Sequence, residues 1–203
     1  MNEFLIALRS LIALTLLTGV AYPLLVTGLG QLANAEAVQG SLIKRGEQVV
    51  GSRWLAQPFQ QAGYFWPRPS AGDYATVASG ASNKGPTSKD LLDKIKARKA
   101  DLLKAHLLPA DAFVPPELLM ASGSGLDPEL SPAAVQFQVP RVAHARGLQP
   151  QELAALIQSA TKGPQLGLLG APRVNVLELN MALLQLEQRK FSLKQGHQHE
   201  SQQ

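Results

Sequence analysis

The feature that most constrains this chain is an apolar segment near its N-terminus, which carries no charged side chain from Ser10 to Leu32. As a helix that rises about 1.5 Å per residue, this segment spans roughly 34 Å, and the hydrocarbon core of a bilayer is about 30 Å thick. Arg9 precedes the segment and can reach the lipid headgroups with its long side chain. The sequence therefore predicts a short tail over residues 1–9 and a transmembrane helix over residues 10–32.

A proline and several glycines inside this segment indicate what the helix packs against. Pro23 removes one backbone donor, which membrane helices tolerate where a neighbour or a local kink compensates. Gly19, Gly28 and Gly30 leave shallow surfaces on which a second helix can approach closely. Because a lone anchor exposed to lipid needs none of these residues, we expect the helix to pack against helices of partner proteins.

A cleaved signal peptide is the alternative for this segment. The tripeptide Ala33-Asn34-Ala35 fits a cleavage site, but the apolar run is much longer than the roughly 7–15 residues of a signal core, so we favour a retained helix. Its orientation is weakly specified. Arg9 lies on one side and Lys44 and Arg45 on the other, and the short tail favours a soluble domain outside the cytoplasm.

The rest of the chain suffices for one domain with a hydrophobic core, which we place at residues 33–190, before a disordered polar tail over residues 191–203. The 203 residues include no cysteine, which excludes disulfides, thiolate nucleophiles and cysteine-based metal sites. The net charge is +4, and the densest basic stretch, residues 89–104, also contains aspartates. Such a mixture is typical of a solvated helix face, so we expect no nucleic-acid binding.

Glycine, proline and serine divide the soluble part into short elements. We predict a hairpin that turns at Gly46, a loop over residues 70–88, a short helical turn opened by Pro115 and Pro116, and a strand over residues 174–176. Helices are predicted over residues 88–106, 131–147 with a kink or break at Pro140, 150–163 and 177–190. The fold class is therefore α+β: one transmembrane helix plus a mixed α/β soluble domain, in which a small mixed sheet is flanked by helices.

Aromatic residues are concentrated just after the hairpin. Five of them fall within residues 54–66, namely Trp54, Phe59, Tyr64, Phe65 and Trp66. We interpret this cluster as the nucleus of the hydrophobic core rather than as a cage for a ligand.

A glycine- and serine-rich loop, residues 122–127, has two interpretations. Exposed backbone N–H groups in such loops can bind phosphate, but no Gly-Lys-Ser/Thr follows, so the loop is not a P-loop, and a plain tight turn is the favoured reading. Arg141, Arg146 and Arg173 could hold an anion, although pairing with surface carboxylates is the simpler expectation.

Support for catalysis is weak. Ser122 or Ser124, with His144 and Asp127, would provide the residue types of a triad, but no Gly-x-Ser-x-Gly elbow frames either serine. No paired carboxylates or His-x-x-x-His pattern indicates a metal centre. We therefore predict an anchored domain with no catalytic residue and no metal.

Several long motifs occur in this chain in a characteristic order. They are Tyr64-Phe-Trp-Pro-Arg-Pro-Ser-Ala71, Ser79-Gly-Ala-Ser-Asn-Lys-Gly-Pro86, Ala121-Ser-Gly-Ser-Gly-Leu-Asp-Pro128, Gln138-Val-Pro-Arg-Val-Ala143 and Leu169-Gly-Ala-Pro-Arg-Val-Asn-Val-Leu177. With these motifs, and with the Tyr22-Pro23 pair, the chain closely resembles the C subunit of the Kdp potassium-transporting P-type ATPases of bacteria and archaea. The resemblance extends to about Gln188 and leaves out the His/Gln-rich tail.

This resemblance implies a non-catalytic subunit in a bacterial inner-membrane complex. Its partners would be a channel-like potassium-binding subunit, an ATP-hydrolysing subunit and a small hydrophobic subunit, together with the lipid bilayer. The chain would assemble and stabilise the complex and act as a catalytic chaperone that raises the ATP affinity of the hydrolysing subunit. It lacks an Asp-Lys-Thr-Gly phosphorylation motif, and one helix cannot form a pore, so it is neither the pump nor the channel.

The matching motifs also give candidate contact residues. A nucleotide- or partner-binding loop would comprise Ser122, Gly123, Ser124, Gly125, Asp127, Gln138 and Arg141. Further partner contacts would be Arg68, Ser82, Asn83, Arg173 and Asn175, and the membrane helix would pack through Gly19, Tyr22, Pro23 and Gly28. No cofactor would be tightly bound, and ATP would be met only in a ternary complex with the hydrolysing subunit.

Two routes to an effect on ATP remain open at this point. If the soluble domain is periplasmic, the effect must be allosteric and pass through the membrane helix. If the domain is cytoplasmic, the Gly/Ser loop and Arg141 could contact ATP, and the chain would be a membrane-anchored nucleotide-binding module. A hydrolase that uses Ser124 is a third hypothesis, which we disfavour.

Overall fold

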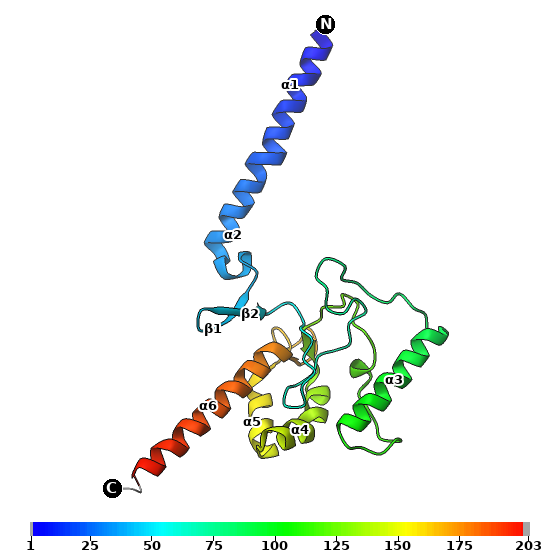
Figure 1. The fold of residues 1–203 in the computed structure, drawn as a ribbon. Helices are drawn as coiled ribbons and strands as arrows, with labels where there is room; N and C mark the ends of the chain where they lie inside the picture. Colours follow the sequence, from blue (N-terminus) through cyan, green and yellow to red (C-terminus); the bar gives the residue numbers. More distant parts are fainter. Residues whose placement is uncertain (1, 201–203) are drawn as a thin grey trace. The chain divides into compact units, whose positions relative to one another are not determined.

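The structure, a computed structural model, describes residues 2–200, with side-chain burial described for residues 2–193. Between Ser52 and Arg53 the chain divides into two compact units, which we describe in turn (Figure 1). The first unit consists of α1 (Asn2–Leu16), the π-helical segment η1 (Leu17–Ala21), α2 (Tyr22–Val38), β1 (Leu42–Arg45) and β2 (Gln48–Ser52).

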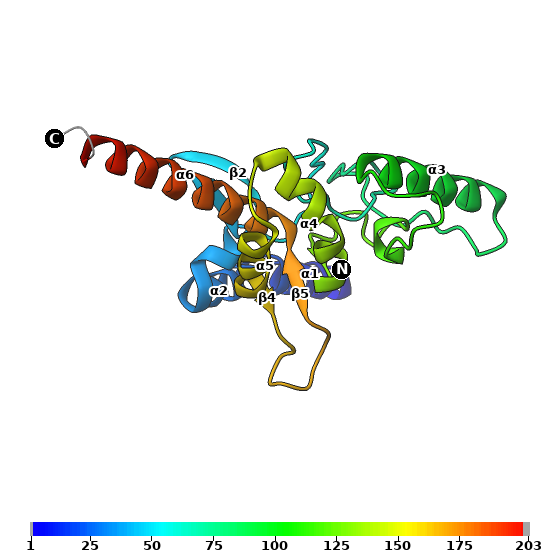
Figure 2. The same cartoon turned by 90° about the horizontal axis from the view of Figure 1, so that it is seen from below.

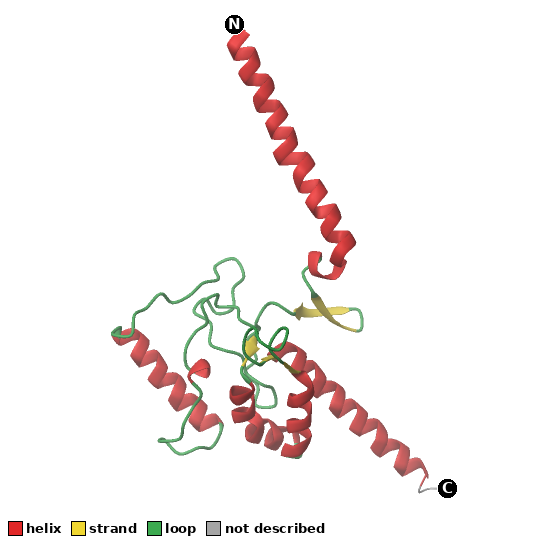
Figure 3. Cartoon of the chain, turned by 180° about the vertical axis from the view of Figure 1, so that it is seen from behind, coloured by secondary structure: helices red, strands yellow, loops and turns green. Residues whose placement is uncertain are grey.

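The second unit begins with a long loop that extends to Ser88, drawn in green in Figure 3. Its elements are α3 (Lys89–Ala105), the 3-10 turn η2 (Pro116–Leu118), β3 (Glu129–Leu130), α4 (Pro132–Arg146), α5 (Pro150–Ala160), β4 (Thr161–Lys162), β5 (Arg173–Asn175) and α6 (Val176–Glu200). The α+β class is confirmed, and the predicted loop over residues 70–88 contains neither helix nor strand up to Ser88.

In the part of the chain that the structure describes, one helix is long and apolar enough to cross a membrane, and it runs from Asn2 to Val38. The predicted segment over residues 10–32 lies wholly within it. Residues 2–9, predicted as a tail, are helical as well, because neither Glu3 nor Arg9 opposes helix formation.

Pro23 is accommodated by a π-helical turn directly before it. The hydrogen bonding widens over Leu17–Ala21, so that the N–H of Tyr22 donates to the carbonyl of Leu17, five residues earlier. In a regular helix a proline ring clashes with the carbonyl four residues earlier, here that of Gly19, and a π-helical turn relieves such a clash. The local compensation expected for Pro23 is therefore supplied by the chain's own backbone.

The long helix bends back at Asn34. The backbone angles of Asn34, φ −161° and ψ 83°, are not helical. Its side-chain oxygen accepts a hydrogen bond from the N–H of Ala37 at 3.0 Å, so Asn34 caps the last helical turn before the hairpin.

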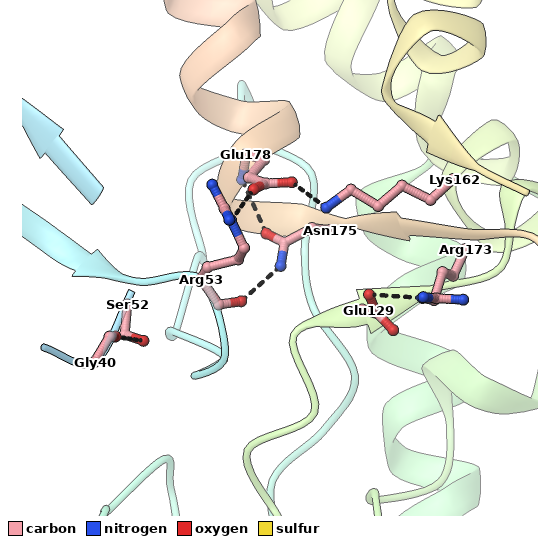
Figure 4. Close-up of polar contacts among 8 residues, drawn as sticks. All are labelled: Gly40, Ser52, Arg53, Glu129, Lys162, Arg173, Asn175 and Glu178. Atoms are coloured by element: carbon pink, nitrogen blue, oxygen red, sulfur yellow. Dashed lines mark hydrogen bonds and ion pairs between the residues drawn. The ribbon is translucent and has the colours of Figure 1, made fainter. Parts of the chain in front are cut away.

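The predicted hairpin is confirmed as an antiparallel pair of β1 and β2, with Gly46 in the turn at φ 63°. It forms a sheet of its own. The hydroxyl of Ser52 donates to the carbonyl of Gly40 at 2.7 Å and so ties the end of β2 to the end of the helix (Figure 4).

The second unit contains a three-stranded sheet in the order β3-β5-β4, in which both pairs of strands are antiparallel. The predicted mixed sheet is therefore wrong. A short hairpin joins β4 to β5, and a hairpin can connect only antiparallel neighbours. The strand predicted over residues 174–176 is shifted by one residue, because α6 already begins at Val176.

The helices largely begin where their caps predict. The hydroxyls of Ser88 and Ser131 accept hydrogen bonds from the N–H groups of Leu91 and Ala134, and Gly147 ends α4 at φ 62°. However, α4 continues through Pro140, so a break there is wrong. Pro140 lies on the exposed face of α4, where water can satisfy the freed carbonyl.

Two helix ends also differ from the prediction. α5 ends at Ala160 rather than near Gly163, because Thr161 and Lys162 pair with β5 as strand β4. α6 continues to Glu200, so residues 191–200 are helical where we predicted a disordered tail. From Lys190 to Gln195 the sequence has no glycine or proline that would stop a helix. Residues 201–203 lie outside the described residues.

The core of the second unit lies between the sheet and helices α4, α5 and α6. Its most deeply buried apolar side chains are Phe65, Leu130, Val135, Val139, Val142, Leu153, Val174, Val176, Leu179 and Leu183. Phe59 and Trp66 pack against this core, as predicted for the aromatic cluster. Trp54 is 59% exposed and does not belong to it.

Candidate functional site

The centre of the second unit is a buried polar network that holds one loop segment, residues 62–66, against α4 and α6. The side-chain amide of Gln138 accepts from the N–H of Trp66 at 2.7 Å and donates to its carbonyl at 3.0 Å. Asn180 does the same for Phe65, with both distances at 2.9 Å. Each amide thus replaces a neighbouring β-strand for a loop that has none.

Arg141 is the third member of this network and is buried. One terminal nitrogen of its guanidinium group donates to the carbonyls of Ala62 and Tyr64, and the other donates to Gln138 at 2.8 Å. Its Cζ lies 4.0 Å from the ring centre of Trp66 in a cation–π contact. Burial lowers the pKa of Arg141 to about 10, so the group stays charged at neutral pH.

His106 completes the network from the end of α3. Its Nδ1 lies 2.8 Å from the carbonyl of Leu102, and its Nε2 accepts from Arg141 Nε at 3.2 Å, which together select the tautomer protonated on Nδ1. Burial lowers the pKa of His106. The hydrogen bond to Leu102 opposes this effect, and the charge of Arg141 adds to it.

This geometry predicts an acid-sensitive fold. Between the lowered pKa of the folded state and the ordinary histidine pKa of 6.5, the unfolded chain takes up a proton at His106 more readily than the folded chain does. Stability is therefore complete above that pH and falls as the pH decreases toward the lowered pKa of the folded state. Thermal unfolding between pH 7.5 and 5 measures this loss. His106→Gln, which keeps an acceptor for Arg141 but cannot titrate, should show a flatter profile over the same range.

The Gly/Ser loop is hydrogen-bonded internally and to Pro69. The N–H of Ser122 donates to the carbonyl of Pro69, and the N–H of Gly125 donates to that of Ser122, both at 3.3 Å. The N–H groups of Leu126 and Asp127 donate to the hydroxyls of Ser124 and Ser122. Ser122 and Gly125 are buried, whereas Gly123 and Ser124 are exposed.

Gly125 is the tightest position in this loop. Its φ is 71°, and a Cβ there would lie 2.8 Å from the carbonyl oxygen of Gly80. Only glycine fits such a left-handed position against another backbone. The Ser/Gly segment around residue 80 therefore lies directly against the Gly/Ser loop.

Arg68 and Asp127 join these loops through an ion pair of 2.9 Å. Nε of Arg68 is buried and has no hydrogen-bond partner within the described residues. The hydroxyl of Tyr74 donates to the carbonyl of Arg68 at 2.7 Å, and burial raises the pKa of Tyr74 to about 12, so that this donor keeps its proton.

Ser82 and Asn83, the candidate contacts in the preceding loop, are exposed. Ser82 lines a cleft of about 590 Å³ between this loop and α3, and Asn83 adopts a left-handed backbone at φ 50°. The charged residues of the cleft are of both signs, namely Asp73, Lys84, Lys94, Arg98 and Asp101. The cleft therefore does not select for an anion such as a nucleotide phosphate.

Asn175 and Arg173, on strand β5, take part in a separate cluster (Figure 4). The amide of Asn175 donates to the carbonyl of Arg53 at 2.7 Å and accepts from the N–H of Glu178 at 3.0 Å, so Asn175 caps α6. Glu178 pairs with both Arg53 and Lys162, and Arg173 pairs with Glu129 at 3.0 Å. Burial raises the pKa of Glu178, but its hydrogen bonds and charge contacts with Lys162 and Arg53 outweigh this and lower the pKa overall.

The capping role of Asn175 can be tested directly. We expect Asn175→Ala to destabilise the second unit by about 2 kcal/mol, because a buried cap and a hydrogen bond to the loop at Arg53 are lost together. Denaturant titration followed by circular dichroism measures the change. Asn175→Asp, which retains the capping oxygen but not the donor to Arg53, should lie between the alanine variant and the wild type.

A family model described as "K+-transporting ATPase, c chain" matches residues 4–185. The chain belongs to this family. Similar proteins named potassium-transporting ATPase KdpC subunit occur in Rhodospirillum rubrum, 53% identical over 174 residues (84% of this chain, 89% of that protein), and in Xanthomonas oryzae pv. oryzae, 50% identical over 181 residues (87% and 86%). A third, from Sorangium cellulosum, is 51% identical over 180 residues (87% and 94%).

The structure separates the candidate residues of the second unit into four groups. Gln138 and Arg141 lie in the buried network; Arg68, Asp127 and the Gly/Ser loop are joined by an ion pair and hydrogen bonds; Ser82 and Asn83 lie in the exposed loop before α3; Arg173 and Asn175 lie on β5. Gly19, Tyr22, Pro23 and Gly28 lie exposed on the long helix, where a neighbouring helix can reach them. No group of three or more His, Asp or Glu side chains that could hold a metal occurs among the described residues.

Two members of the buried network were not predicted as site residues. Asn180 lies three positions after the last quoted motif, and nothing near it in the sequence indicates the loop that it binds, 115 positions earlier. His106 is an isolated histidine at a helix end, and nothing near it in the sequence indicates its contact with Arg141.

Proposed function

We propose that this chain is the non-catalytic subunit that assembles and stabilises a high-affinity, ATP-driven potassium uptake complex. As a member of the KdpC family, the chain is an accessory subunit of a potassium-transporting ATPase. The observation that carries the proposal is the family match from residue 4 to residue 185, which includes both the long apolar helix and the folded second unit. Its partners would be the channel-like, the ATP-hydrolysing and the small hydrophobic subunits.

The long apolar helix is proposed to span the inner membrane once, with the second unit in the periplasm. The family match begins within this helix, which supports a retained helix over a cleaved signal. Gly19 and Gly28, together with the π-helical turn before Pro23, offer surfaces for neighbouring helices of the complex.

The chain is further proposed to raise the ATP affinity of the hydrolysing subunit without contacting ATP itself. Gln138 and Arg141 are buried, and both donate hydrogen bonds to the loop segment 62–66. Four backbone N–H groups of the Gly/Ser loop already donate within the protein, and α4 starts only at Pro132. These contacts leave few donors for a phosphate, which supports an allosteric effect over direct binding.

Adding the chain back to the complex tests this proposal. We expect the apparent KM for ATP of the hydrolysing subunit to decrease as purified full-length chain is supplied. The chain alone should show no saturable binding of labelled ATP up to millimolar concentration. Saturable binding that Ser124→Trp abolishes would instead support the membrane-anchored nucleotide-binding module. Ser124→Ala should leave the ATPase activity of the complex unchanged. An unchanged activity would rule out a hydrolase that uses Ser124.

A further inference from the structure

A protruding hairpin loop between β4 and β5 displays three leucines at the surface. Leu166, Leu168 and Leu169 are 91%, 87% and 61% exposed, and we call them the leucine knob. Figure 2 shows this loop extending away from the helices and sheet of the second unit. No charged residue occurs between Lys162 and Arg173. Apolar side chains gathered in this way at a tip mark a site of interaction.

The backbone of the knob is ordered by its own hydrogen bonds. Gln165 and Leu169 exchange two of them, at 2.7 and 2.9 Å, and the N–H of Leu168 donates to Gln165 at 3.1 Å. Leu166 has φ 53°, a left-handed conformation that disfavours leucine, and Gly167 follows at φ 75°. Asparagine would relieve both the exposure and the strain at Leu166, so neither solvation nor backbone geometry explains a leucine at this position.

The base of the loop helps to decide between a lipid and a protein contact. Lys162 pairs with Glu178 at 2.9 Å, and Arg173 pairs with Glu129 at 3.0 Å. Both cations at the base are therefore neutralised, and the loop has no tryptophan or tyrosine. Segments that lie in a membrane interface typically combine apolar residues with free lysine or arginine and with aromatic side chains. The features of this loop favour a protein pocket.

We propose that the leucine knob inserts into an uncharged apolar pocket on the extramembrane surface of a partner subunit of the same transport complex. This inference rests on the proposed function, which supplies the partner. A preformed turn loses little conformational freedom on binding, so the three leucines can contribute most of their burial to affinity. Through β5 the knob is continuous with the cap of α6 at Asn175, so a bound partner is coupled to the core of the unit.

The first test is a double variant, Leu166→Asn with Leu168→Asn, in the full-length chain. Asparagine tolerates the left-handed backbone at position 166, so the turn is preserved while the apolar surface is lost. Val77→Asn is the matched control, because Val77 is 99% exposed in a different loop. When each affinity-tagged chain is purified from membranes, we expect the double variant to retain about tenfold less of the partner subunits and the control to retain the wild-type amount.

The second test locates the contact and does not depend on the stability of the double variant. The chain has no native cysteine, so Leu168→Cys can carry a single photoactivatable benzophenone within the assembled complex. We expect an adduct with another subunit from position 168 and none from Val77→Cys. Adducts with lipid only, or with a second copy of this chain, or no adduct, would overturn the inference.

The two proposals fail in different ways. If wild-type chain retains no partner subunits, the proposed function is wrong. If wild-type chain and the double variant retain them equally well, the function stands and the leucine knob is not the contact.

Discussion

Arg141→Met should lower the free energy of unfolding of the second unit by about 3 kcal/mol or more. The variant keeps the apolar stem but removes the donors on which the carbonyls of Ala62 and Tyr64 and the side chain of Gln138 depend. Each of these three acceptors would lose a charge-assisted hydrogen bond, and the cation–π contact with Trp66 would be lost.

Denaturant titration of the full-length chain in detergent, followed by tryptophan fluorescence, measures this loss. Both tryptophans, Trp54 and Trp66, lie in the second unit, so the signal reports on that unit. Arg189→Met is the control, because Arg189 is exposed on α6, and it should change stability by less than about 0.5 kcal/mol. Equal stability of the two variants would show that Arg141 does not hold the loop segment 62–66 in place.

Gly125→Ala is the second substitution with a large expected effect, about 3 kcal/mol of destabilisation. The alanine would have to adopt φ 71°, and its Cβ would lie 2.8 Å from the carbonyl oxygen of Gly80, which is backbone and cannot simply rotate away. The Gly/Ser loop and the segment around residue 80 would have to separate.

The same loop supplies the control for this prediction. Gly123→Ala introduces a Cβ with nothing within 4 Å, so stability should change by less than about 0.5 kcal/mol. The melting temperatures of the two variants give the comparison. A Gly125→Ala variant as stable as Gly123→Ala would mean that these loops do not pack as described.

Local features of this fold could be predicted from the sequence because their causes are local. The hairpin turns at Gly46, and Ser88 and Ser131 cap α3 and α4, since each of these signals acts within a few residues. The apolar helix could be predicted for the same reason. The antiparallel sheet could not, because its strands have only two or three residues each and are specified by tertiary pairing.

The sequence could not predict which way the side chains of the candidate site residues face. The family-like motifs single out Gln138 and Arg141 but do not say which way these side chains face. Their partners in the loop segment 62–66, Trp66 and Tyr64, lie 72 and 77 positions away, so the pairing exists only in the folded unit. A buried arginine that holds a loop and an exposed arginine that binds phosphate have the same sequence signature.

The central claim is that the potassium-transporting complex requires this non-catalytic chain. The most direct measurement is the K⁺-stimulated ATPase activity of the complex purified from cells with and without the chain, with the remaining subunits present in equal amounts. The proposal predicts that activity is lost without the chain and restored when full-length chain is supplied. Full K⁺-stimulated activity in its absence would contradict the claim.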